Sequence, residues 1–289
     1  MRWKMENKMT QHKKSGSISF HNASLNIDGR QLWQNLNLEI AQGEFLAVLG
    51  PNGAGKTSLL RVLLGITSLT NGKVEMGEDI ACRDGNSVGY IPQQKDFDRS
   101  LSVRGRDIVR FGLDGHQYGF HFYNAAAARR IDKAIEEVGA SSYADKPIGY
   151  LSGGEQQRLR IAQAMLGNPK ILLCDEPLAS LDIPNQQVIS NLIGKQYREN
   201  KTTVIFVTHE INPVLPMVDR VLYLTGERWA AGTPQEVLTT TCLSQLYATP
   251  VNVTQINGRI VVAPGELELT GSHLPCHTQV LRSRRCEWA

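Results

Sequence analysis

The nine residues from Gly50 to Ser58 constrain the fold more strongly than any other stretch of this chain. They fit the pattern G-x-x-x-x-G-K-[ST] at every fixed position. A strand-like apolar run, residues 44–49, precedes them, and a helix-like run, residues 58–64, follows. In a strand–loop–helix unit, glycines let backbone N–H groups close around phosphate oxygens, and the new helix offers its positive end to the same anion. The stretch therefore predicts a nucleotide-phosphate site.

Two side chains of this loop carry specific expectations. Lys56 is expected to reach the β- and γ-phosphates, and the Thr57 hydroxyl is expected to ligate Mg²⁺. The residues expected to bind the nucleotide are Gly50, Pro51, Asn52, Gly53, Ala54, Gly55, Lys56, Thr57 and Ser58.

Composition places the chain among ordinary globular proteins. Of its 289 residues, 41% are apolar and 20% are charged. No apolar run approaches the roughly 20 residues of a membrane helix, and the basic, polar N-terminus has no secretory signal. We therefore expect a cytoplasmic protein that reaches a membrane only through a partner. The net charge of +3 is too small to indicate nucleic-acid binding.

The order of patterns along the chain predicts an α/β fold. Alternating strands between residues 17 and 76, with a turn at Asp28–Gly29, predict a small antiparallel sheet. Residues 101–150 have helical spacing, and further on short apolar strands alternate with helices, which predicts a mostly parallel sheet covered on both faces. Asn257–Gly258 predicts a C-terminal β-hairpin within residues 248–265. Residues 1–16 and 266–289 are expected to be poorly ordered tails.

The acidic pair Asp175–Glu176 closes the apolar run 171–174. Ligands in such sheets collect at the carboxyl ends of the strands, so both carboxylates are expected to face the phosphates. Asp175 is expected to hold Mg²⁺ through water, and Glu176 to orient or deprotonate the attacking water. The alternative is an acidic pair in a surface loop, which the four preceding apolar residues disfavour.

The run Leu151–Arg158, with the sequence LSGGEQQR, resembles the signature sequence of ABC-type ATPases. It has the character of an exposed helix N-terminus that offers a hydroxyl and N–H groups to an anion. In that family the anion is the γ-phosphate of ATP bound by the opposite subunit, so the resemblance implies a homodimer with two composite sites. The residues implied are Ser152, Gly153, Gly154 and Gln156. An ordinary capping box formed by Ser152 and Glu155 is the alternative, and both can hold at once.

The other motifs of the ABC family follow in the expected order, and the resemblance covers residues 17–247, with a helical subdomain at about 95–160. It implies that Gln93 senses Mg²⁺ and water, that Asp182 crosses the dimer interface and that His209 contacts the γ-phosphate. The implied catalytic residues are thus Glu176, His209, Gln93 and Lys56, and the implied metal-binding residues are Thr57, Gln93 and Asp175. Ile27 stands where the family has an aromatic residue that stacks on adenine, so we expect weaker selectivity for adenine.

The single ATPase domain without fused membrane helices implies an importer subunit that docks on separate permease subunits at the inner face of the cell membrane. Residues 87–113, 209–214 and 251–262 are similar to the ATPases of zinc and manganese importers. That likeness implies uptake of a divalent metal ion and, indirectly, a metal-binding extracytoplasmic protein. An iron-chelate importer ATPase is the first alternative, and a non-transport ABC ATPase is the second. In the tail, His273, Cys276, His277 and Cys286 fit no standard zinc spacing.

Overall fold

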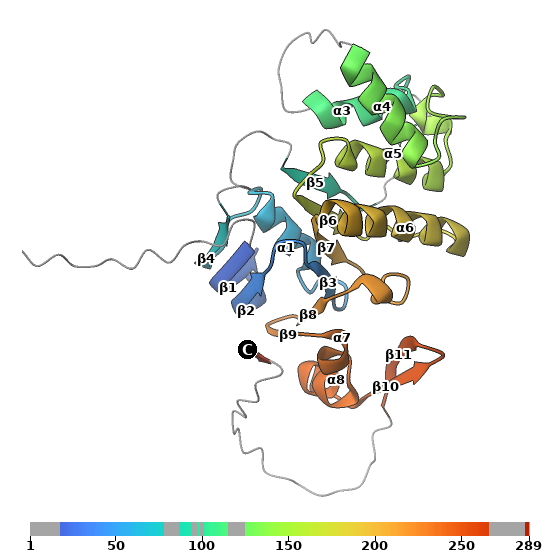
Figure 1. The fold of residues 1–289 in the computed structure, drawn as a ribbon. Helices are drawn as coiled ribbons and strands as arrows, with labels where there is room; N and C mark the ends of the chain where they lie inside the picture. The colour runs from blue at the N-terminus through green and yellow to red at the C-terminus, as the bar shows by residue number, and fades with distance from the viewer. Residues whose placement is uncertain are drawn as a thin grey trace, which may run out of the picture.

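The computed structural model describes residues 18–77, 87–93, 97–98, 101–114, 125–265 and 287–288. Its centre is a seven-stranded sheet with the strand order β12-β9-β8-β3-β7-β6-β5, with helices on its sides (Figure 1). The strands of this sheet are β3 (Phe45–Leu49), β5 (Val88–Ile91), β6 (Ile171–Asp175), β7 (Thr203–Val207), β8 (Arg220–Thr225), β9 (Arg228–Gly232) and β12 (Glu287–Trp288). All pairs from β8 to β5 are parallel, which confirms the predicted mixed α/β architecture.

The three middle strands are apolar because both of their faces are covered. Every residue of β3, β6 and β7 is buried. Successive side chains of β3 point to opposite faces, so Phe45, Ala47 and Leu49 join one apolar cluster while Leu46 and Val48 join the other. Helix α6 (Ile183–Asn200) contributes to the first cluster and α1 (Lys56–Leu63) to the second. The sheet therefore lies between two apolar layers, as continuous apolar strands require.

A second, three-stranded sheet is antiparallel and has the order β2-β1-β4. Its strands are β1 (Ile18–Ile27), β2 (Arg30–Ile40) and β4 (Asn71–Met76). Asp28 and Gly29 connect the first two strands, with φ values of 52° and 78°. Two consecutive positive φ angles define the type I′ turn, whose twist matches that of the strands. The predicted hairpin is confirmed.

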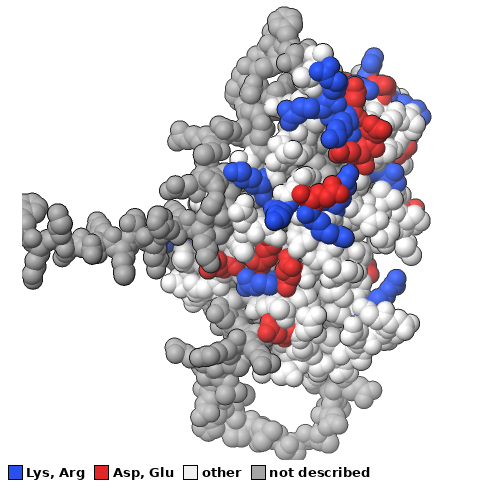
Figure 2. All heavy atoms as spheres, in the orientation of Figure 1, with Lys and Arg blue, Asp and Glu red and all other residues white. Residues whose placement is uncertain are grey.

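Three helices lie together beyond β5, at one end of the molecule (Figure 1). They are α3 (Gly105–Asp114), α4 (Ala125–Glu137) and α5 (Gly153–Met165). On the face shown in Figure 2, basic and acidic side chains are interspersed over this part. Arg106 of α3, for example, pairs with Asp132 of α4 and with Asp145. Within the described ranges, no helix is long and apolar enough to cross a membrane.

The C-terminal part contains elements that the sequence patterns did not predict. These are β9, the short helix α7 (Pro234–Val237), α8 (Thr240–Tyr247) and β12. The predicted hairpin is present as β10 (Val251–Ile256) and β11 (Arg259–Pro264), again with a type I′ turn, at Asn257 and Gly258. Of the expected tail 266–289, only Glu287–Trp288 are described, paired with β9. The expected N-terminal tail and the tail residues His273, Cys276, His277 and Cys286 lie outside the described residues.

Candidate nucleotide site

The loop between β3 and α1 has a conformation that only glycine allows at two positions. Gly50 has a φ of 138°, and a Cβ there would lie 2.0 Å from the carbonyl oxygen of Leu224. Gly55 has a φ of 91°, and its Cβ would lie 2.9 Å from the ring of the fully buried Trp33. Positive φ and close backbone approach both exclude larger residues. The loop is thus pressed against β8 on one side and β2 on the other.

Helix α1 begins with free backbone donors. Gly55 is its N-cap and supplies no side-chain cap, and the first helical bond runs from the Leu59 amide to the Gly55 carbonyl. The amides of Lys56, Thr57 and Ser58 are therefore left without helical partners, as at every helix start. These residues line a cavity of about 560 Å³. A cavity of this size with unpaired N–H groups at a helix N-terminus suits a phosphorylated ligand.

The Lys56 side chain lies back over the loop. Its Nζ donates to the carbonyl oxygens of Gly50 at 2.9 Å and Pro51 at 3.0 Å, and the residue is only 5% exposed. Burial lowers the pKa of Lys56, while the charges of Glu176 and Asp175 act against that shift. An anion in the cavity would give this ammonium group a stronger partner than the two carbonyls, because ion-assisted hydrogen bonds are stronger than neutral ones.

Thr57 and Asp175 are 118 residues apart and meet at the end of β6. The Thr57 hydroxyl donates to Oδ1 of Asp175 at 2.9 Å, and Asp175 is 2% exposed. Burial raises the pKa of Asp175, and the hydrogen bond from Thr57 partly opposes this. A hydroxyl and a carboxylate are the hard oxygen ligands that Mg²⁺ prefers, usually with phosphate oxygens and water. The pair fits Mg²⁺. Among the described residues there is no cluster of three or more His, Cys, Asp or Glu side chains arranged for a metal.

Replacing Asp175 by Asn is expected to raise the melting temperature of the nucleotide-free protein by a few degrees. Because the pKa of Asp175 is raised by folding, its ionisation costs stability, and that cost grows as the pH rises from the unfolded-state pKa through the folded one. The neutral amide avoids the cost and still accepts from Thr57.

The measurement is thermal unfolding at neutral pH and again at the lowest pH that keeps the protein folded. The stability gain of Asp175→Asn should shrink at the acidic end, where the wild-type carboxyl is protonated. Addition of Mg²⁺ and ATP should stabilise the wild-type protein more than the variant. Thr57→Val, which removes the hydroxyl without changing charge, is the matched control and should lower the melting temperature. A less stable Asp175→Asn protein would contradict the expectation.

Two polar side chains, Gln93 just after β5 and His209 just after β7, converge on Glu176. Its Oε2 accepts from Nε2 of Gln93 at 3.1 Å and lies 3.9 Å from Nδ1 of His209. Glu176 has a φ of 47°, and its amide donates to the Val207 carbonyl. For a glutamate, a positive φ costs about 1–3 kcal/mol, and such strained residues cluster at active sites and ligand clamps. Gln93 and Glu176 also line the cavity with the phosphate loop.

The segment Leu151–Arg158 lies elsewhere. Ser152 caps α5, and its backbone amide and hydroxyl both donate to Oε2 of Glu155 at 2.8 Å, so the expected capping box is present. A Cβ on Gly154 would lie 3.0 Å from the Asn185 side chain, which accepts from Arg158 at 2.8 Å. None of the described residues that line the phosphate-loop cavity comes from this segment. Within one chain, the start of α5 and the phosphate loop are therefore separate.

Two further predicted ligands from the same region lie in different settings. Asp182 is the N-cap of α6 and accepts from the Asn185 amide at 3.1 Å, next to Ile183, which is 80% exposed. Gln156 is 3% exposed, and its side-chain amide bonds to Ile148, Leu151 and Phe97. In the single chain its side chain therefore ties loops together, and its contact with nucleotide stays a prediction.

The far end of the cavity is formed by the antiparallel sheet. Ile27, Arg30 and Leu32 line it. A Cβ on Gly53 would lie 3.5 Å from both terminal nitrogens of Arg30, so this guanidinium reaches the phosphate loop. Sequence reasoning missed Arg30 because it lies over 20 residues before Gly53 in the chain, and no local sequence pattern links residues so far apart. Ile27, which stands where the family has an aromatic residue, lines the cavity, and no described aromatic side chain does.

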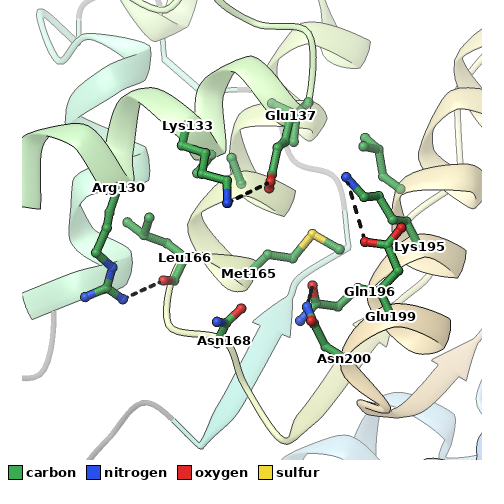
Figure 3. Close-up of a pocket in the computed structure, with 14 residues that line it drawn as sticks. Arg130, Lys133, Glu137, Met165, Leu166, Asn168, Lys195, Gln196, Glu199 and Asn200 are labelled. Atoms are coloured by element: carbon green, nitrogen blue, oxygen red, sulfur yellow. Dashed lines mark hydrogen bonds and ion pairs between the residues drawn. The ribbon is translucent and has the colours of Figure 1, made fainter.

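A second cavity, of about 300 Å³, lies between α4, the end of α5 and α6 (Figure 3). Its charged groups already have partners: Lys133 pairs with Glu137, Lys195 pairs with Glu199, and Arg130 donates to the Leu166 carbonyl. Asn168 and Asn200 of its wall precede β6 and β7, so it lies at the amino ends of the strands, opposite the phosphate loop. It offers no comparable set of free donors.

Comparisons with known proteins agree with these features. The family model described as "ABC transporter" matches residues 33–179. The zinc import ATP-binding protein ZnuC of Photorhabdus laumondii is 32% identical over 222 residues, 77% of this chain and 80% of that protein. The manganese transport protein MntB of Halalkalibacterium halodurans is 29% identical over 80% of this chain and 91% of its own length. The sulfate/thiosulfate import protein CysA of Photorhabdus laumondii is 32% identical over 90% of this chain and 72% of its own length.

Two solved structures show the same fold. One is an inward-facing transporter described, provisionally, as of the metal-chelate type; it has a TM-score of 0.74 and 28% identity, over 89% of this chain and all of that one. The other is a dimeric ATP-binding cassette, MJ0796, in a post-hydrolysis state with ADP and phosphate. Its TM-score is 0.62, and it is 27% identical over 73% of this chain and 97% of that one.

Proposed function

The chain belongs to the ABC transporter family and is an ATPase of that family, and from this premise we propose that it powers the import of a divalent metal ion, zinc or manganese. The observation that carries the ATPase chemistry is the convergence of Gln93 and His209 on the Glu176 carboxylate beside the phosphate loop. The identity of the cargo rests on similarity, because the site described above holds nucleotide and not cargo.

The residues divide the work of hydrolysis as follows. The amides of Lys56, Thr57 and Ser58 and the Lys56 ammonium bind the phosphates. Thr57 and Asp175 hold Mg²⁺, which when bound neutralises charge on the phosphate oxygens. Glu176 orients the attacking water and accepts its proton, and Gln93 fixes the carboxylate that does so. His209, which lies beside Glu176, donates to the γ-phosphate. Its side chain is 61% exposed and therefore accessible to the ligand.

We further propose that each site is completed by a second copy of the chain. Ser152, Gly153 and Gly154 form a helix N-terminus that is separate from the cavity of their own chain. The exposed Ile183 beside Asp182 supports a contact surface at the same face. The dimeric state of the MJ0796 cassette, bound to ADP and phosphate, is consistent with this arrangement. The dimer acts on integral permease subunits, and a metal-binding extracytoplasmic protein delivers the ion.

We favour import of a zinc or manganese ion over three alternatives. The zinc and manganese relatives support a metal ion. The metal-chelate transporter structure supports a chelated metal, the class to which an iron-chelate cargo belongs, and the sulfate/thiosulfate relative supports an oxyanion. A non-transport ABC ATPase is the remaining alternative. The modest net charge of +3 and the mixed charges of the face in Figure 2 give it no nucleic-acid surface there.

The test is uptake by cells that lack this chain. Deletion of its gene should abolish high-affinity uptake of labelled zinc or manganese and leave iron-chelate and sulfate uptake unchanged. The wild-type gene should restore uptake, and a Glu176→Gln gene, expressed to the same level, should not. Loss of sulfate or iron-chelate uptake with intact metal uptake would contradict the cargo. Co-purification with soluble partners alone, without a multispanning membrane protein, would contradict transport itself.

A further inference from the structure

Hydrogen bonds of Thr208 hold the start of the loop that bears His209. The His209 side chain itself does not hold the loop by packing. Thr208 is 4% exposed, and its hydroxyl donates to the Glu210 carbonyl at 2.8 Å and accepts from the Glu210 amide at 3.1 Å. Among the described contacts, His209 has only the 3.9 Å approach to Glu176. The direction of the imidazole therefore depends on where the backbone of this loop is held.

The C-terminal hairpin holds that loop at Asn212. Nδ2 of Asn212 donates to the carbonyl oxygen of Ile260 at 3.0 Å, and Oδ1 accepts from the Ile260 amide at 2.8 Å. The side-chain amide thus pairs with one residue of β11 as a neighbouring strand would. Its two bonds fix both the distance and the rotation of the loop relative to the hairpin, which a single bond would not.

The two-residue turn of the hairpin determines which way the backbone amide and carbonyl of Ile260 point. In a hairpin with a two-residue turn, Ile256 and Arg259 exchange hydrogen bonds, so the next pair, Gln255 and Ile260, does not. The amide and carbonyl of Ile260 therefore face outward from the hairpin. The outward-facing groups of an edge strand are available to pair with another segment, and here Asn212 is that partner.

The hairpin, the His209 loop and the phosphate loop also share one cavity, of about 380 Å³. Ile260 and Val262 of β11 line it together with Pro51, His209 and Asn212. β11, the His209 loop and the phosphate loop thus all border the same cavity. A shift of the hairpin would move His209 relative to the phosphates with no change in the phosphate-binding amides.

From these contacts we infer that Asn212 is a positioning residue: it anchors the His209 loop to Ile260 of the C-terminal hairpin, and so sets the reach of His209 to the γ-phosphate. The inference rests on the role proposed for His209. It assigns the hairpin a part in ATP hydrolysis, although the hairpin lies outside residues 33–179, which match the family model.

The test measures ATP hydrolysis by the full-length chain with Asn212→Ala. We expect kcat to fall about 10- to 100-fold, the size expected for a misplacement of about 1 Å, with KM for ATP changed less than about twofold because the phosphate-loop contacts are intact. In a His209→Ala background the same substitution should change the residual rate by less than about twofold. Ile260→Pro, which removes the N–H partner from the other side, should reproduce the loss and serves if Asn212→Ala does not fold.

Asn252→Ala is the matched control, because Asn252 is an exposed asparagine on β10, and it should hydrolyse ATP as the wild type does. Equal losses from Asn212→Ala with and without His209 would overturn the inference alone. A parallel rise in KM, or a wild-type kcat for Asn212→Ala, would also overturn it. A His209→Ala chain with wild-type turnover would overturn the role proposed for His209, and this inference with it.

Discussion

Replacing Glu176 by Gln should reduce ATP turnover by roughly 10²–10⁴-fold, the range for loss of a positioned general base. The amide keeps the size of the side chain and its hydrogen bond with Gln93, but it cannot accept a proton from water. Because Lys56, Thr57 and the free amides of α1 are unchanged, ATP should still bind. The variant should therefore accumulate as an ATP-bound dimer.

Two measurements check this expectation: steady-state phosphate release, and size-exclusion chromatography with and without Mg²⁺ and ATP. The variant should elute as a dimer with ATP and as a monomer without it. Gln93→Glu is a useful comparison, because it replaces the hydrogen bond to Glu176 by a like-charge contact and should impair turnover without abolishing the base. Turnover of Glu176→Gln at the wild-type rate would contradict the assignment of Glu176 as the base.

Replacing Gly153 by Asp should lower hydrolysis by about 10²–10³-fold, the cost of losing a donor that stabilises developing charge. An aspartate in the first turn suits the α5 helix dipole, so the fold should be retained. It would, however, repel the γ-phosphate presented by the partner subunit. Gly153→Asn, of nearly the same size and neutral, is the matched control and should lose much less activity.

The proposed sharing of each site between two chains predicts recovery of activity on mixing two defective variants. Lys56→Ala disables the phosphate loop, and Gly153→Asp disables the signature segment. In a head-to-tail dimer formed from one copy of each, one site combines both defects and the other is intact. Equal mixing should therefore restore about a quarter of the wild-type sites, since about half of the dimers are mixed and each has one good site. No recovery, at concentrations where the wild type dimerises, would contradict a site shared between two chains.

Much of the fold follows from local rules and was predictable. The buried strands β3, β6 and β7 are apolar throughout, and both type I′ hairpins carry the Asp-Gly or Asn-Gly pair that their positive φ angles need. β9, α7 and α8 were missed. Helix α8 begins with two threonines after the N-cap Thr239, a composition without helical preference. It is stabilised by the Thr239 cap and by burial of Leu243 and Leu246.

The candidate site likewise has parts that the sequence predicted and parts that it did not. The sequence by itself determined the phosphate loop, because its glycines at Gly50 and Gly55 are required by the backbone path, and it determined the acidic end of β6. Only the tertiary structure decided which side chains meet there. Thr57 with Asp175, Gln93 with Glu176, and Asn212 with Ile260 are contacts between residues 118, 83 and 48 positions apart. The tertiary structure also buries Gln156 and places Arg30 against Gly53. A motif specifies a local backbone shape, whereas the direction of a side chain depends on what packs against it from distant parts of the chain.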